Sequence, residues 1–211
     1  MFLCAGLASC GPLGSGSSSD GSSVSSSDSS SDSSSDSSKA PDTSAQYAGA
    51  VVRYAPKADV NPTLLMAIIY NEAYKPHDAA SERLWQQLNP GAAFGIVNMH
   101  QAAFDDAKKG RDFANRSWDE LPDDPALAVE AAAWYLHDLR RMLPADNQCT
   151  CTRDELLALG YNTGPTNMRL FAHGTTVGPM ADTYLVELRH NWPAATAAIK
   201  AASASPRTAA S

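Results

Sequence analysis

A run of serine between residues 15 and 38 sets the main limit on what this chain can fold into. Apart from glycines, Val24 is the one apolar residue in this run, and aspartates interrupt the run at intervals. Such a segment offers too little apolar surface to offset the entropy that the chain loses on ordering. We therefore predict a disordered, mildly acidic linker over residues 11–42.

The rest of the chain is sufficient for one domain. Residues 43–200 give roughly 160 residues, enough for a single hydrophobic core, and residues 201–211, "AASASPRTAAS", are predicted to form a flexible tail. The formal net charge is −7, of which the four aspartates of the serine run between residues 15 and 38 contribute −4. This balance argues against a nucleic-acid-binding protein, which usually presents a basic face. We find no apolar stretch long enough to cross a membrane as a helix.

The first ten residues have the features of a targeting signal. "MFLCAGLASC" is a short apolar run that ends in Leu7-Ala8-Ser9-Cys10, which resembles a bacterial lipobox. In that motif the Cys is lipidated and becomes the first residue after cleavage. Residues 1–10 are therefore predicted to be a lipoprotein-type signal segment, with Cys10 as the lipidation site and the serine-rich linker as the spacer. The alternative is an ordinary chain terminus with an incidental Cys.

Two further cysteines stand close together in "DNQCTCTRDE". A disulfide between Cys149 and Cys151 would close a tight ring, and a zinc site would need further ligands at suitable spacing. We interpret the pair as a loop feature of undetermined redox state. The five histidines are scattered along the sequence, and we assign no metal site.

The segment from Ala45 onward reads as helices joined by short turns. Apolar residues recur at helical spacing in pieces such as "NPTLLMAIIYNEA", "ASERLWQQLNPG" and "DDPALAVEAAAWYLHDLRRML". Thr152 with Glu155 forms a capping-box pattern ahead of "LLALGYNTG", and Thr43 or Ser44 is a candidate N-cap for the first helix. Alternating strand patterns are scarce. The expected fold class is all-α.

Four short pieces carry the functional signal: "NEAY" (71–74), "AAFGIVNMH" (92–100), "GYNTG" (160–164) and "TYLVEL" (183–188). In this order on a helical domain, they resemble the catalytic domain of bacterial lytic transglycosylases of the soluble-transglycosylase (SLT) type, which is related to goose-type lysozyme. The resemblance implies a lysozyme-like single helical domain over residues 43–200. It makes Glu72 the catalytic residue. The substrate-binding residues that it implies are Tyr74, Phe94, Gly95, Ile96, Asn98, Tyr161, Asn162 and Tyr184.

The chain departs from the family pattern in three places. The Ser that follows the catalytic Glu is Ala73 here, and the Gly-Leu-Met-Gln segment reads Gly95-Ile96-Val97-Asn98. The segment between Glu72 and Gly95 also contains an insertion, "SERLWQQLNP", which is expected to reshape one end of the substrate groove.

The residues around Glu72 favour a catalytic role without reference to the family. Leu64, Ile68 and Glu72 are four residues apart and share a helix face, so the carboxyl is expected in a largely apolar environment. Desolvation there would raise its pKa, as a general acid at a glycosidic oxygen requires. The alternative is a solvated acid at the last turn of the helix. Asp78, the next carboxylate along the chain, is expected to cap the following helix rather than to serve as a second catalytic acid.

The resemblance implies cleavage of peptidoglycan between N-acetylmuramic acid and N-acetylglucosamine, with formation of 1,6-anhydromuramic ends and with no metal or organic cofactor. The partners expected are peptidoglycan glycan strands and, through Cys10, the lipid of a membrane; a monomer on the cell-wall side of that membrane is expected, and no nucleic acid. Two alternatives stay open. One is a hydrolytic muramidase on the same fold, with Asp78 or another acid positioning water. The other is a non-catalytic lipoprotein that binds cell-wall glycan.

Overall fold

A computed structural model describes residues 43–72 and 78–205. Within these ranges the chain is helical and has no β-strand; a single isolated bridge pairs Phe94 with Met99. The all-α prediction is therefore confirmed. The predicted signal segment with Cys10, the linker, and Tyr74 lie outside the described residues.

The described residues form eight α-helices and two 3-10 helices. In chain order these are η1 (Thr43–Tyr47), α1 (Ala48–Tyr54), α2 (Pro62–Glu72), α3 (Ala79–Leu88), α4 (Gln101–Ala107), η2 (Trp118–Glu120), α5 (Pro125–Met142), α6 (Arg153–Thr163), α7 (Pro165–Ala172) and α8 (Pro179–Ala204).

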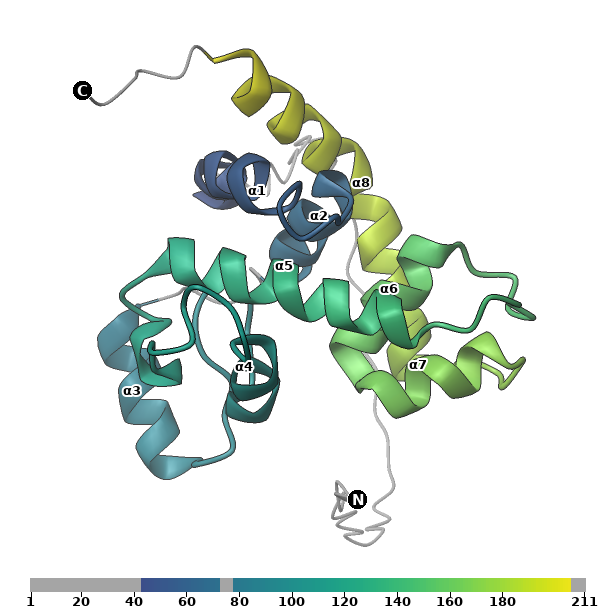
Figure 1. The fold of residues 1–211 in the computed structure, drawn as a ribbon, viewed down its shortest axis with the longest axis horizontal. Helices are drawn as coiled ribbons and strands as arrows, with labels where there is room; N and C mark the ends of the chain where they lie inside the picture. The colour runs from purple at the N-terminus through teal and green to yellow at the C-terminus, as the bar shows by residue number, and fades with distance from the viewer. Residues whose placement is uncertain (1–42, 73–77, 206–211) are drawn as a thin grey trace, which may run out of the picture. The chain divides into compact units, whose positions relative to one another are not determined.

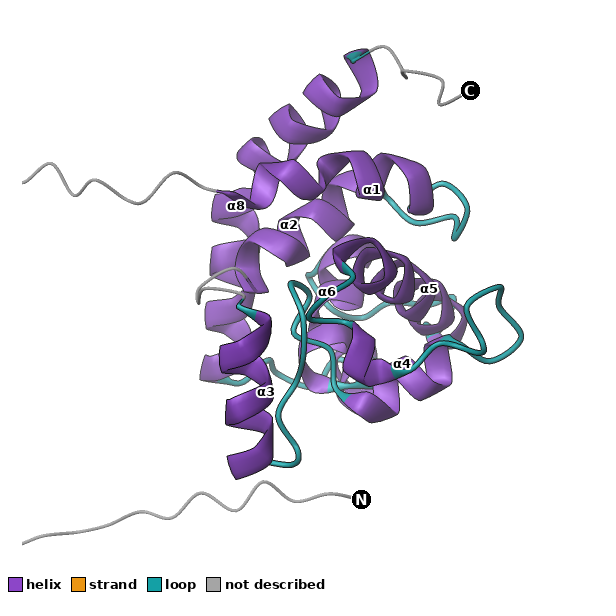
Figure 2. Ribbon diagram, turned by 90° about the vertical axis from the view of Figure 1, so that its left-hand side faces the viewer, coloured by secondary structure: helices purple, strands orange, loops and turns teal. Residues whose placement is uncertain are grey.

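The helices are arranged around α5. It lies between α1 and α2 on one side and α4 on the other, and α6 and α7 pack together beyond its C-terminal end (Figure 1). The last helix, α8, runs along α2 and also packs on α1 and α6, as Figure 2 shows from the side. One continuous core fills the space between these helices, and its fully buried side chains include Leu64, Leu65, Ile68, Phe104, Leu136 and Leu139.

Helix starts follow the sequence signals closely. The predicted capping box is present, because the Thr152 Oγ1 accepts from Glu155 N at 3.2 Å and Thr152 N donates to the Glu155 carboxylate at 2.7 Å. Asp78 caps α3 by accepting a hydrogen bond from Ser81 N at 2.8 Å, as expected. Each cap satisfies backbone donors that the first turn of a helix leaves unpaired.

Two helices differ from expectation at their ends. The first predicted helix is a 3-10 turn, η1, followed by the short α1, and α1 starts without a side-chain cap. The last helix does not stop near residue 200 but continues to Ala204, so the predicted start of the tail at residue 201 lies inside α8. The alanines of this segment explain the difference, because alanine is the strongest helix former.

Helix α3, the predicted insertion, is amphipathic but presents its apolar side to solvent. Leu84, Trp85 and Leu88 are 61%, 57% and 71% exposed. The opposite, polar side faces the rest of the domain: Glu82 is buried, and the Arg83 guanidinium donates to Asp119 O at 2.9 Å. Amphipathic helices normally bury their apolar side, so α3 is held to the domain by polar contacts.

No helix in the described ranges is long and apolar enough to cross a membrane.

Candidate active site

Glu72 is the last residue of α2, and its side chain is buried. The residue is 6% exposed, and Leu64 and Ile68, on the same face of the helix, are fully buried. The apolar environment predicted from the four-residue spacing is therefore present. The alternative in which the helix ends in solvent at Glu72 is wrong.

Two hydrogen-bond donors from distant parts of the chain hold the Glu72 carboxyl. The Asn98 side-chain amide donates to Oε2 at 3.1 Å, and the Tyr184 hydroxyl donates to Oε1 at 3.0 Å. Asn98 lies between α3 and α4, whereas Tyr184 belongs to α8. Of the predicted site residues, the fold thus brings Glu72, Asn98 and Tyr184 into direct contact.

Asn98 closes a tight turn that starts at Gly95. The bridge pairs Phe94 and Met99 through two backbone hydrogen bonds, and Asn98 N donates to Gly95 O at 2.9 Å. Gly95 has φ +71°, and a Cβ there would lie 3.0 Å from Leu121 O, so this position requires glycine. Asn98 has φ 48°, a region that asparagine tolerates better than most residues. The sequence "GIVN" is thus a turn that points its last side chain at Glu72.

Aromatic side chains hold the backbone of the turn in place. The Trp118 indole N–H donates to Met99 O at 2.8 Å, and its ring stacks on Phe94 with centroids 4.3 Å apart. The Tyr161 hydroxyl donates to Val97 O at 2.7 Å. These contacts leave the turn little freedom to move relative to Glu72.

Phe94 and Ile96, both predicted to bind substrate, are only 3% exposed. Their side chains belong to the hydrophobic core. The resemblance points to this segment, but the sequence of a turn does not indicate which of its side chains point inward.

The two tyrosines of the site stay protonated over a wide pH range. Burial, reinforced by the negative charge of Glu72, raises the pKa of Tyr161 and of Tyr184 well above the ordinary value. Each hydroxyl therefore remains a donor at neutral pH. Asn162, also a predicted site residue, follows Tyr161 near the end of α6 with its side chain exposed.

Several residues support this site without having been singled out from the sequence. Asn71 joins α2 to α8, since its amide donates to Tyr184 O at 3.0 Å and its oxygen accepts from Asn191 at 2.9 Å. Glu82 of α3 is 8% exposed and accepts a hydrogen bond from Gly95 N at 2.7 Å. Their partners lie too far away along the chain for a local pattern to reveal them.

Asp78 does not take part in the contacts around Glu72 that the described residues make. Its carboxylate caps α3, and the hydrogen bonds from Ser81 lower its pKa. This placement agrees with the capping role expected for Asp78.

A hollow of about 380 Å³ lies beside the residues that flank the turn. It is lined by Pro90, Gly91, Ala92, His100, Gln101, Ala102, Asp105 and Trp118. None of the predicted site residues lines it, so the hollow is separate from Glu72. Among the residues with described positions, no cluster of His, Cys, Asp and Glu is arranged to hold a metal ion.

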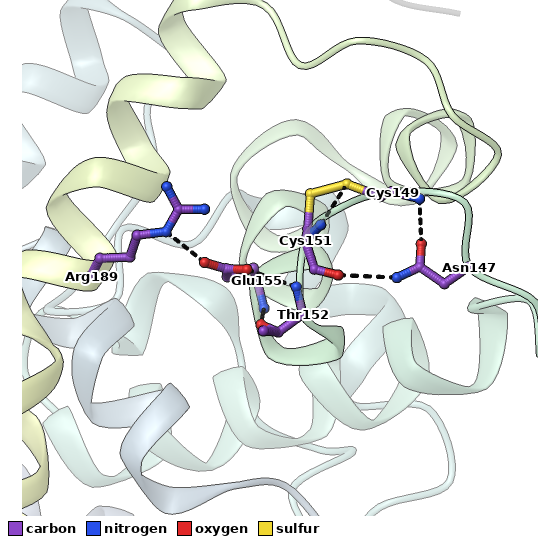
Figure 3. Close-up of a disulfide and its surroundings, with 6 residues drawn as sticks. All are labelled: Asn147, Cys149, Cys151, Thr152, Glu155 and Arg189. Atoms are coloured by element: carbon purple, nitrogen blue, oxygen red, sulfur yellow. Dashed lines mark hydrogen bonds and ion pairs between the residues drawn. A yellow bond between two sulfur atoms is a disulfide. The ribbon is translucent and has the colours of Figure 1, made fainter.

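Cys149 and Cys151 form a disulfide in the loop before α6 (Figure 3). The tight ring considered from the sequence therefore exists, and the redox state left open is the oxidised one. Asn147 braces the ring, because its amide donates to Cys151 O at 3.1 Å and its oxygen accepts from Cys149 N at 2.9 Å. Thr152, the N-cap of α6, follows directly. The disulfide thus lies directly before the helix that carries Tyr161.

The helical fold and the buried acid at the end of α2 define a lysozyme-like domain. A comparison with protein-family models matches residues 49–173 to the transglycosylase SLT domain. This match covers more than half of the 211 residues, so the chain belongs to the SLT transglycosylase family. No curated protein and no solved structure matches the chain. At the level of the family, the activity is that of a peptidoglycan lytic transglycosylase.

Proposed function

We propose that this protein cleaves the β-1,4 bond between N-acetylmuramic acid and N-acetylglucosamine in peptidoglycan and leaves 1,6-anhydromuramic ends. The observation that carries the proposal is the Glu72 carboxyl, which is 6% exposed and hydrogen-bonded to Asn98 and Tyr184. A buried carboxyl held by fixed donors is preorganised to exchange a proton with a bound substrate.

In the first step Glu72 acts as an acid. It gives its proton to the glycosidic oxygen, and the bond from that oxygen to the anomeric carbon of the muramic residue breaks. In the second step the Glu72 carboxylate takes the proton of the muramic C6 hydroxyl, and the C6 oxygen forms the new bond to the anomeric carbon. No water enters, because the nucleophile is part of the substrate. Most glycosidases need a second carboxylate; here the internal hydroxyl takes over that role.

Asn98 and Tyr184 orient the carboxyl for both steps. An ionised carboxyl has about four acceptor sites, so donors on both oxygens still leave room for a proton and for the substrate oxygen. Tyr184 can keep donating throughout, because its raised pKa keeps the phenol protonated. The hydrogen bonds favour the charged form of the carboxyl after the first step, when it must accept the C6 proton.

The glycan is proposed to lie along the turn and the end of α6. Backbone groups of Ile96 and the exposed amide of Asn162 are suited to N-acetyl substituents, since these offer one donor and one acceptor. Tyr74, in the segment after α2, is proposed as a further contact.

Mass spectrometry of peptidoglycan digested with the purified protein tests the reaction. Anhydro ends are lighter than reducing ends by one water, about 18 Da per cleavage, because ring closure takes up no solvent. We expect anhydro products, and little change in rate for Asp78→Asn, whose carboxylate caps α3. Reducing ends together with a large loss of rate in Asp78→Asn would identify a hydrolytic muramidase instead.

We further propose that Cys10 carries a lipid that anchors the domain to a membrane, facing the cell wall. The support is the "LASC" sequence followed by the serine-rich linker. Cys10→Ala is expected to move the protein from the membrane fraction to the soluble fraction without loss of activity on isolated cell wall. A wild-type protein that is already soluble and unlipidated would exclude the anchor.

A further inference from the structure

The inserted helix α3 places a buried carboxylate against the turn that contacts Glu72. Glu82 is 8% exposed, and its Oε2 accepts the backbone N–H of Gly95 at 2.7 Å. A buried carboxylate is costly unless it is well paired, and its hydrogen bonds are stronger than those of a neutral acceptor. The contact between Glu82 and Gly95 is therefore an unusually strong hold on one backbone group.

This backbone group is the start of the turn. Gly95 O accepts from Asn98 N at 2.9 Å, and the Asn98 amide in turn donates to Glu72 at 3.1 Å. Glu82, Gly95, Asn98 and Glu72 thus form one connected series of hydrogen bonds. A shift of Gly95 would move Asn98 and, through it, the orientation of the Glu72 carboxyl.

Helix α3 is anchored to the domain by contacts other than Glu82. Arg83 donates to Asp119 O at 2.9 Å and pairs with the Asp123 carboxylate. Asp78 fixes the start of the helix by its cap. Because of these contacts, the backbone that carries Glu82 is expected to stay in place when the Glu82 side chain is changed.

We propose that Glu82 is a positioning residue that fixes the Gly95–Asn98 turn and thereby holds Asn98 on Glu72. The proposal rests on the proposed function of Glu72 for its effect on rate. This proposal gives the inserted helix a role. The polar side of α3 faces the domain and supplies the acceptor that keeps Asn98, at the end of the turn, in contact with Glu72. In this role Glu82 acts through Gly95 and needs no contact with the glycan.

Two variants of the full chain test this role. Glu82→Leu removes the acceptor and leaves the Gly95 N–H unpaired, whereas Glu82→Gln keeps a neutral acceptor of the same length. We expect Glu82→Leu to speed hydrogen exchange of the Gly95 amide about tenfold or more and to lower kcat about 10- to 100-fold with little change in KM. Glu82→Gln is expected to restore slow exchange and most of the rate. Gln87→Ala, an exposed change in the same helix, is the control.

The outcomes separate the two proposals. Unchanged Gly95 exchange in Glu82→Leu, measured by NMR without substrate, would overturn the positioning role even if the wild type cleaves glycan. A loss of rate in Glu82→Gln as large as in Glu82→Leu, with Gly95 exchange as slow as in the wild type, would also overturn it, since the rate would then depend on something other than the hold on the turn. If the wild type cleaves no glycan but exchange changes as expected, the proposed function fails and the hold of Glu82 on the turn stands.

Discussion

Two regions of this domain each bury a glutamate, and they treat it differently. Glu72, at the junction of α2, the turn and α8, is 6% exposed and receives hydrogen bonds from Asn98 and Tyr184. Glu130, in the middle of α5 near α1, is 8% exposed. It makes no hydrogen bond or ion pair with any residue whose position the structure describes.

The difference shows that burial alone does not fix the orientation of a carboxyl. Burial raises the pKa of Glu130, and the charge of Asp112 adds to the effect, while Lys57 and Arg53 oppose it. No donor orients this carboxyl among the described residues. At Glu72, by contrast, donors from two separate elements converge on the oxygens. We infer that converging donors, more than low exposure, distinguish a carboxyl built for proton transfer.

The largest effect is expected from Glu72→Gln, with Glu130→Gln as its matched control. Both variants remove one carboxyl from a buried site and keep the volume. Glycan cleavage should fall by about 100- to 10,000-fold in Glu72→Gln, the usual contribution of general acid–base catalysis, and stay near the wild-type rate in Glu130→Gln. Release of anhydro products over time measures both.

The contrast drawn between Glu72 and Glu130 would be wrong if the two variants behaved alike. Cleavage near the wild-type rate by Glu72→Gln, with the melting temperature unchanged, would leave a non-catalytic glycan-binding protein as the better description. Equal losses in both variants would mean that the assay reports stability rather than catalysis.

A smaller effect is expected from Asn98→Gly. Glycine adopts the φ of 48° found at this position, so the turn survives while the amide that donates to Glu72 is lost. We expect a decrease in kcat of about 10- to 100-fold, measured in steady-state assays. Asn98→Ala should lose as much activity and, in addition, about 1 kcal/mol of stability, since alanine has a Cβ but lacks the short polar side chain with which asparagine tolerates positive φ.

Tyr184→Phe tests the other donor. The variant keeps the ring and removes the hydroxyl that donates to Glu72 at 3.0 Å. We expect kcat to fall about tenfold. The basic limb of the pH–rate profile, where Glu72 loses the proton that it must donate, should move to higher pH, because the lost hydrogen bond favoured the charged carboxyl. A pH–rate profile identical to that of the wild type would show that Tyr184 serves packing alone.

The smallest effect concerns the stability contributed by Glu130. Because folding raises the pKa of Glu130, the folded state favours the protonated form. The stabilisation from this group is therefore present below the unfolded pKa of about 4.3 and is lost as pH rises through the folded value. Glu130→Gln should raise the melting temperature at neutral pH, at about 2–4 °C for each kcal/mol gained in a domain of this size. Thermal melts near pH 4 should show no gain.

The helices could be predicted from sequence wherever a cap and a periodic apolar face coincide. α6 begins at Thr152 and α3 begins after Asp78 because their side chains satisfy the first free backbone donors. The end of α8 was placed too early, since composition alone made "AASA" resemble a tail. The orientation of α3 could not be read either, because its pattern is the same whichever side faces the domain.

The site was predictable at the level of motifs and not at the level of contacts. Glu72 was identified from its position at the end of an apolar helix and from the resemblance of the surrounding pieces. Its neighbours Asn98 and Tyr184 were expected to bind substrate, but the structure shows them holding the acid. Glu82 carried no local signal, because its partner Gly95 lies in a turn whose path depends on the whole fold.

The contact between Tyr184 and Glu72 joins residues that are 112 positions apart in the chain. Closing so long a loop costs conformational entropy, which the packing of the surrounding helices must offset. During synthesis Glu72 therefore emerges well before the helix that completes its surroundings. Residues 49–173, the part that matches the family, end before α8 begins. A chain that ended at that length would carry the acid without its tyrosine and without the helix that packs along α2, so full activity is expected only once the final helix has docked.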